Sequence, residues 1–224
     1  MKRSLLTAVL SSALLAAAPA VVLAQNAAQA AAPAQAAPSS ASQVVLSSST
    51  RILATLDKRR PEFKADPAAL RQYVTSEFNT LFDSDYAARL VLGVHGRGAA
   101  EADVKQFGAA LTEKLLSAYG ARLLDFNARL QVKVKSESLL PGGRGVKVAT
   151  EFTQADQTVT PIIFYARQVG SQWKVFDVEV EGMSFVQTFK NQFDAPLRQK
   201  SIAQVAADLR EGKLQVNTNA SGRN

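Results

Sequence analysis

The chain has 224 residues, of which 26 are lysine or arginine and 19 are aspartate or glutamate, so its formal net charge is +7. It contains no cysteine and a single histidine. These counts exclude disulfides and thiolate chemistry, and they leave few combinations for a histidine-based metal or hydrolytic site. No arginine-rich run or known nucleic-acid-binding motif accompanies the basic charge. An acidic protein surface or an anionic headgroup is therefore favoured as a partner over nucleic acid.

The N-terminal residues have the pattern of a cleavable secretory signal peptide. Lys2 and Arg3 precede an apolar run, and short side chains at Val22-Leu23-Ala24 predict cleavage after Ala24. The run is short for a membrane-spanning helix, so we expect export to the bacterial periplasm as a soluble protein. The predicted organisation is a signal peptide at 1–24, a disordered Ala/Pro/Ser-rich leader at 25–42, one folded domain at 43–212 and a disordered tail at 213–224.

The first half of the folded domain is predicted to be helical. An apolar stripe over 45–56 indicates a first helix. Asp66-Pro67 combines an N-cap with proline at the first helical position, and the apolar residues that follow predict a second helix over 70–81. A short helix is expected over 86–92 and a longer one over 104–119.

The second half is predicted to form an antiparallel sheet of four strands. Apolar and polar residues alternate over 130–135, 146–152, 159–167 and 173–180, with turns at hairpin spacing. Pro161 lacks the N–H group that a central strand uses, so the third strand is expected at an edge or a bulge. Because helices precede the sheet and further helices follow it, the predicted fold class is α+β.

Aromatic side chains are concentrated where the last strand meets the next helix. Strict alternation would place Phe176 and Val178 on one face of the strand and Asp177 on the other. Ser184 begins a capping pattern, and Phe185, Phe189 and Phe193 then share one stripe of the helix. A sheet covered by helices encloses either a packed core or an apolar cavity, and periodicity does not distinguish the two.

Few side chains in this sequence have catalytic potential. His95 lies in the loop GVHGRG, which matches neither a P-loop nor a dinucleotide-binding motif, and a plain surface loop is the favoured interpretation. Asp177 lies among aromatic residues, where a carboxyl group can acquire a raised pKa and act as a general acid or base. We favour the alternative that Asp177 is a hydrogen-bond acceptor for a hydroxyl, a lysine or a helix N-terminus. We predict no catalytic residue and no metal site.

Three segments of the sequence resemble one known family. "WKVFDVEVEGMSFVQTFKNQF", "FDSDYAARLVLG" and "VKQFGAALTEKLLSAYGARLLDF" are similar, in order and spacing, to segments of the MlaC family of toluene-tolerance auxiliary proteins. The resemblance covers nearly the whole chain from Ser42 to Gly212 and makes 43–212 an MlaC-like lipid-binding domain. In the family the loop after "VLG" often carries a bulky aromatic residue, whereas GVHGRG here is richer in glycine.

The resemblance implies a function in binding and transport that involves no catalysed reaction. It implies an NTF2-like α+β fold with an apolar cavity between sheet and helices, and a periplasmic carrier of glycerophospholipid. Its implied partners are an outer-membrane lipoprotein–porin complex and an inner-membrane ABC permease with MCE domains, which together maintain outer-membrane lipid asymmetry. We expect a monomer, and no cofactor apart from the bound phospholipid as cargo. An NTF2-like enzyme that uses Asp177 or His95 and a cargo-free adaptor protein are the alternatives.

The apolar faces of the predicted elements give a set of candidate site residues. Three exposed lysines on the sheet, Lys133, Lys135 and Lys147, are predicted to steer docking to partners. The predicted lipid-binding residues are Tyr86, Leu90, Phe107, Leu111, Leu115, Val132, Val134, Val148, Phe152, Phe164, Val178, Phe185 and Phe189.

Overall fold

The computed structural model describes residues 40–124 and 130–217. Their helices are α1 (Ala41–Lys58), α2 (Arg60–Ala65), α3 (Pro67–Leu81), α4 (Ser84–Leu92), α5 (Glu101–Tyr119), α6 (Phe185–Gln199) and α7 (Ile202–Arg210), with 3-10 segments η1 (Gly93–Gly96), η2 (Gly120–Leu124) and η3 (Pro141–Gly143). The strands are β1 (Gln131–Leu139), β2 (Val146–Thr153), β3 (Val159–Val169), β4 (Gln172–Val180) and β5 (Met183–Ser184).

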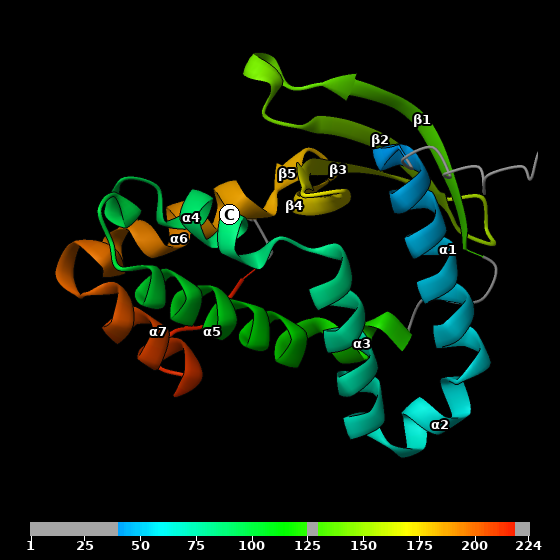
Figure 1. The fold of residues 1–224 in the computed structure, drawn as a ribbon. Coiled ribbons are helices and arrows are strands. Elements are labelled where there is room, and N and C mark those ends of the chain that lie inside the picture. Colours follow the sequence, from blue (N-terminus) through cyan, green and yellow to red (C-terminus); the bar gives the residue numbers. More distant parts are fainter. Residues whose placement is uncertain (1–39, 125–129, 218–224) are drawn as a thin grey trace, which may run out of the picture. The chain divides into compact units, whose positions relative to one another are not determined.

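All five strands form one antiparallel sheet in the order β1-β2-β3-β4-β5 (Figure 1). The α+β prediction is confirmed, but the predicted four strands are joined by a fifth of only two residues, which pairs with the end of β4. The expectation for Pro161 is wrong, because β3 pairs with both β2 and β4. Pro161 lies one residue before the β3–β4 pairing begins at Ile162, so no bond of that ladder needs its missing N–H group.

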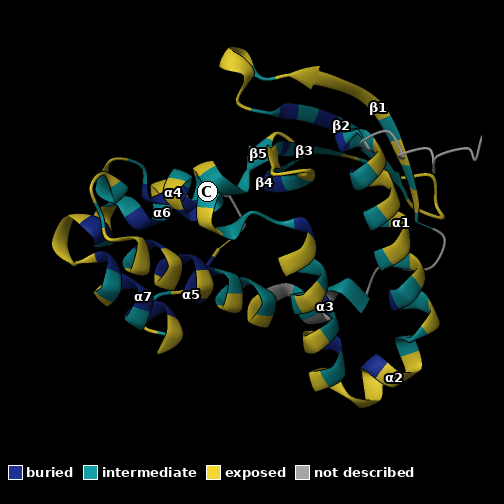
Figure 2. Ribbon diagram, viewed as in Figure 1, coloured by how far each residue is buried: buried dark blue, intermediate teal, exposed yellow. Residues whose placement is uncertain are grey.

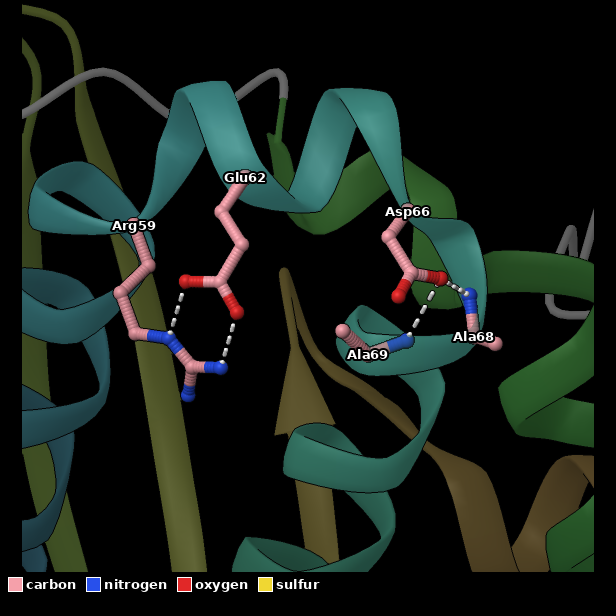
Figure 3. Close-up of polar contacts among 5 residues, drawn as sticks. All are labelled: Arg59, Glu62, Asp66, Ala68 and Ala69. Atoms are coloured by element: carbon pink, nitrogen blue, oxygen red, sulfur yellow. Dashed lines mark hydrogen bonds and ion pairs between the residues drawn. The ribbon is translucent and has the colours of Figure 1, made fainter.

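Hydrogen bonds between residues close in sequence hold the turns between α1, α2 and α3 (Figure 3). The guanidinium of Arg59 donates to both carboxylate oxygens of Glu62, at 2.9 and 2.6 Å, and lies 4.4 Å from the ring centre of Phe63. Asp66 accepts from the N–H groups of Ala68 and Ala69 at 2.9 and 3.2 Å. The predicted cap is therefore present, and it satisfies two donors that the first turn of α3 leaves free.

Buried apolar side chains form three clusters. Helices α4, α5, α6 and α7 pack with one another, whereas α1 lies against β1, β2 and β3 (Figure 1). The turn between β1 and β2 is exposed (Figure 2). The helical core includes Val91, Phe107, Phe193 and Leu209; the sheet core includes Val45, Val148, Phe164 and Val175; and the third cluster joins α1, α2 and α3 through Leu56, Phe63, Leu70 and Val74.

A β-bulge interrupts the alternation predicted for β4. Tyr165 pairs with Asp177, but the next residue of β3, Ala166, pairs with Val175, so Phe176 is an extra residue in the ladder. Such a bulge re-aims the side chains around it. As a result Val175 is buried in the sheet core, while Phe176 turns towards the helices and meets the ring of Tyr86 edge-on, with ring centres 5.1 Å apart.

Both ends of the folded domain extend beyond their predicted boundaries. Ala41, assigned to the leader from the sequence, begins α1 and is fully buried, and the Ser42 N–H group donates to Glu137 on β1 at 2.8 Å. Residues 213–217, assigned to the tail, also pack: Val216 is buried in the helical core, and the Leu214 N–H group donates to the carbonyl of Asp208 at 3.1 Å. The predicted signal peptide, the predicted leader up to residue 39 and the predicted tail from residue 218 lie outside the described residues.

Candidate functional site

A cavity of about 440 Å³ lies between the sheet and the helices. Its volume is within the range of about 300–1,000 Å³ that is usual for pockets that bind small molecules. Apolar side chains make up most of its wall, and one ionisable group, Asp177, lies among them. The lining residues are Phe78, Phe82, Ser84, Ala87, Ala88, Val91, Gly108, Leu111, Thr112, Leu115, Leu116, Gly120, Leu123, Phe176, Asp177, Val178, Phe185, Val186 and Phe189. We call this cavity the apolar pocket.

Small residues bring the helices around the pocket close together. Gly108 of α5 faces α4, where a Cβ atom at its position would lie 3.1 Å from the Ala88 Cβ and 3.3 Å from the Ser84 carbonyl oxygen. Both distances are tighter than ordinary contacts of a Cβ atom, so a larger residue at this position would require α4 and α5 to shift apart by a few tenths of an ångström. Ala87 and Ala88 also line the pocket, and their short side chains leave its interior empty.

Aromatic rings form two sides of the pocket. At the end of α3, the rings of Phe78 and Phe82 stack with their centres 4.3 Å apart. On α6, the rings of Phe185 and Phe189 lie 6.1 Å apart in a tilted arrangement. The bulge in β4 adds Phe176, so three consecutive residues, 176–178, line the pocket, which strict alternation would not allow. The resulting interior suits hydrocarbon and offers almost no polar partners.

The carboxylate of Asp177 accepts three hydrogen bonds that hold the β4–α6 connection. One oxygen accepts from the N–H groups of Val178 and Val186, at 2.8 and 3.0 Å, and the other accepts from the Ser184 hydroxyl at 2.5 Å. Asp177 is thus the acceptor for a hydroxyl and a helix N-terminus that the sequence analysis favours. Burial raises the pKa of the Asp177 carboxyl above its ordinary value, although the hydrogen bonds from Ser184, Val186 and Val178 oppose the shift.

Replacing Asp177 with asparagine should remove a pH-dependent loss of stability. Because the folded-state pKa is raised, the folded protein retains a proton that the unfolded chain releases near pH 3.9. This contribution to stability is full below about pH 3.9 and is lost as the pH rises through the raised folded-state value. Urea unfolding at a series of pH values above 4 should show the wild type losing free energy of unfolding relative to Asp177→Asn. Parallel profiles for the two proteins would contradict this.

Only part of the predicted lipid-binding set lines the apolar pocket. Leu111, Leu115, Val178, Phe185 and Phe189 do so. Tyr86 lies behind Phe176, and Leu90 and Val132 are half-buried outside the lining. The others belong to packed clusters: Phe107 to the helical core, and Val134, Val148, Phe152 and Phe164 to the sheet core beneath α1.

The sequence analysis missed more than half of the pocket wall. It selected large apolar residues, whereas Ala87, Ala88 and Gly108 shape the space by being small. The sequence did contain a signal for Phe78 and Phe82. These two aromatic residues are one helical turn apart and immediately precede the short helix α4, so they could have been predicted to share one face. Alternation grouped Phe176 with Val178, but it did not reveal the bulge that turns Phe176 towards the helices.

The remaining candidate residues lie away from the pocket. His95 is in η1, where its Nε2 atom is 3.0 Å from an oxygen of Asp194 on α6. Lys133 and Lys135 are exposed, Lys147 is half-buried, and the ammonium of Lys135 is 3.1 Å from Glu151. The described part of the chain holds no group of three or more histidine, cysteine, aspartate or glutamate residues that could bind a metal ion. Within residues 40–124 and 130–217, no helix has both the length and the apolar character needed to cross a membrane.

Comparisons with known proteins agree with this architecture. A solved structure described as the phospholipid-binding protein from Ralstonia solanacearum, in complex with a phospholipid, superposes with a TM-score of 0.68 at 18% identity, covering 77% of this chain and 96% of that one. The toluene tolerance protein ttg2D of Pseudomonas putida is 24% identical over 151 residues, which are 67% of this chain and 69% of that protein. The profile of the family described as MlaC protein matches residues 47–211, well over half of the sequence, and the chain therefore belongs to the MlaC family.

Proposed function

We propose that the protein is a periplasmic carrier that holds the acyl chains of a glycerophospholipid in the apolar pocket. The observation that carries this proposal is the pocket itself, a cavity of about 440 Å³ walled by phenylalanine, leucine, valine and alanine side chains. Membership of the MlaC family and the likeness to a phospholipid-binding protein support it. The secretory pattern of the N-terminal residues supports the periplasmic location.

The physical reason for such a pocket is the cost of exposing acyl chains to water. Each methylene group kept from water contributes about 0.8 kcal/mol, so two exposed chains would cost more than ~20 kcal/mol during a crossing between membranes. A carrier must therefore offer an interior about as apolar as a bilayer. It must also release its cargo, so tight polar binding of the chains would hinder unloading.

In this proposal the carrier moves phospholipid between an outer-membrane lipoprotein–porin complex and an inner-membrane permease with MCE domains, as a monomer and without a cofactor. No catalytic step is needed. The three hydrogen bonds that Asp177 accepts support this, since they give the carboxylate a structural role at the β4–α6 connection. The contact of His95 with Asp194 on α6, away from the pocket, adds no second catalytic group there.

Organic extraction of gently purified protein, followed by mass spectrometry, tests the proposal. We expect glycerophospholipid close to one molecule per chain, and uptake of phospholipid from vesicles by the delipidated protein. Lipid-free protein that also takes up nothing would overturn the carrier function and leave a cargo-free adaptor. A non-lipid small molecule that is turned over on incubation would instead favour an enzyme.

Charge reversal of Lys133, Lys135 and Lys147 should slow docking without removing the cargo. These side chains lie on β1 and β2, away from the apolar pocket, and long-range attraction to acidic partners is screened within about 8 Å at physiological salt. Association with immobilised partner complexes should become slower and less dependent on salt, while extracted phospholipid stays at the wild-type amount. A variant that docks at the normal rate would contradict the steering role.

A further inference from the structure

A second hollow of about 350 Å³ adjoins the apolar pocket between α3, the start of α4 and α5. It shares three lining residues with the pocket, Ser84, Thr112 and Leu116, so the two hollows lie directly side by side. Most of its other lining side chains are polar or charged. The lining residues are Arg71, Thr75, Asn79, Ser84, Asp85, Lys105, Ala109, Thr112, Glu113 and Leu116. We call this hollow the polar groove.

The groove is built from two facing helix stripes. Arg71, Thr75 and Asn79 are spaced by four residues, which places them on one side of α3. Lys105, Ala109 and Glu113 are also spaced by four residues, which places them on one side of α5. These faces are mostly polar along the groove, and they are apolar where α3 and α5 reach the pocket, at Phe78, Leu111 and Leu115. The pocket and the groove therefore place an apolar space and a mostly polar one next to each other.

The groove is lined by equal numbers of positive and negative side chains, and only some of them form ion pairs within the protein. Two cations, Arg71 and Lys105, line it together with two anions, Asp85 and Glu113. Lys105 is ion-paired with Glu101 at 2.9 Å, and Asp85 is close enough to interact with it electrostatically. Among the described residues, Arg71 and Glu113 have no hydrogen-bond or ion-pair partner. The groove thus presents one free guanidinium and one free carboxylate beside an apolar cavity.

We propose that the polar groove binds the headgroup of the phospholipid whose acyl chains occupy the apolar pocket, and that it favours a zwitterionic headgroup. This inference rests on the proposed carrier function. Arg71 donates hydrogen bonds to the phosphate, and Glu113 accepts from the headgroup ammonium. A phosphoethanolamine headgroup carries both charges and matches both side chains. A phosphoglycerol headgroup carries only the negative charge, so it has no cationic group to pair with Glu113 or to offset the negative charge of the two carboxylates.

Competitive loading tests the groove directly. Delipidated full-length protein is incubated with vesicles of equal parts phosphatidylethanolamine and phosphatidylglycerol with identical acyl chains, re-isolated and extracted for mass spectrometry. We expect the wild type to carry about threefold more phosphatidylethanolamine than phosphatidylglycerol, a ratio typical of an exposed ion pair. Glu113→Gln should bring the ratio close to one. Arg71→Ala should lower the loading of both lipids about threefold.

Matched controls separate a headgroup contact from a general change in charge. Arg97 is an exposed arginine outside the groove, so Arg97→Ala removes the same charge and should change neither the amount nor the ratio. Wild-type protein that takes up no phospholipid at all would overturn the carrier function itself. If the wild type loads normally but Arg71→Ala and Glu113→Gln keep its amount and ratio, the carrier function stands and the headgroup assignment is overturned.

Discussion

Replacing Phe193 with alanine in the delipidated protein should lower the free energy of unfolding by about 3–5 kcal/mol, and the same change at Phe189 should lower it by less. Both rings are buried on the same helix, at 1% and 2% exposure. Phe193 packs edge-on against Phe107, with ring centres 5.5 Å apart, and lies outside the pocket lining. Phe189 borders the pocket, so the space that its removal leaves merges with an existing cavity instead of forming a new enclosed one.

The comparison needs lipid-free protein, because bound cargo stabilises the folded state by its own binding energy. Urea unfolding of the wild type and the two variants at one pH gives the three free energies. In lipid-loaded protein, Phe189→Ala should also reduce retention of cargo during dilution, whereas Phe193→Ala should act on stability alone. An equal, core-sized loss at both positions would refute Phe189 as a wall of the pocket.

Filling the pocket with a tryptophan at Ala87 should remove bound phospholipid while the fold remains intact. Ala87 lies on α4, lines the pocket and is half-buried, so a larger side chain can enter the existing space. A tryptophan side chain buries about 150–250 Å² and competes for the volume that acyl chains need. We expect extracted phospholipid to fall at least tenfold. Overpacking of a filled core lowers the free energy of unfolding by about 1–3 kcal/mol. Because the pocket of the lipid-free protein is empty, we expect no such loss of stability for Ala87→Trp.

Ala102→Trp is the matched control, since Ala102 is an exposed residue of α5 outside the pocket. This variant should keep the wild-type amount of phospholipid and the wild-type thermal midpoint. If Ala87→Trp retains the normal amount of lipid and is as stable as the wild type, the acyl chains occupy a different site. If it unfolds, the region around Ala87 is packed rather than hollow.

Most elements of the fold were predictable because their signals act over a few residues, whereas α2 and the two-residue β5 were not predicted. Asp66 caps α3 through N–H groups two and three residues away, and Ser184 accepts from the Gln187 N–H group at the start of α6. Each such signal is complete within one turn of helix. The exposed lysines and half-buried valines of β1 follow from alternation in the same way. Long-range contacts were not needed to place any of them.

The pocket could not be predicted in the same way, because it depends on how separate elements meet. Phe107 and Leu111 share one stripe of α5 and both belong to the helical core, yet only Leu111 also lines the pocket. Periodicity identifies the buried face of a helix but carries no information about empty space beside it. The orientation of Phe176 depends on a register shift between two strands, which alternation alone does not reveal. The packed residues of the sheet core entered the predicted site for the same reason.

Photo-crosslinking with a phospholipid that carries a diazirine in its acyl chain tests the central claim most directly, because it locates the chains on the protein. After loading, irradiation and proteolysis, the account predicts adducts on pocket residues from three elements: Leu111 or Leu115 of α5, Val178 of β4, and Phe185 or Phe189 of α6. Val134 and Phe152, which pack against the sheet core beneath α1, should carry none. Adducts confined to that side of the sheet, with the α5 and α6 residues unmodified, would contradict the account.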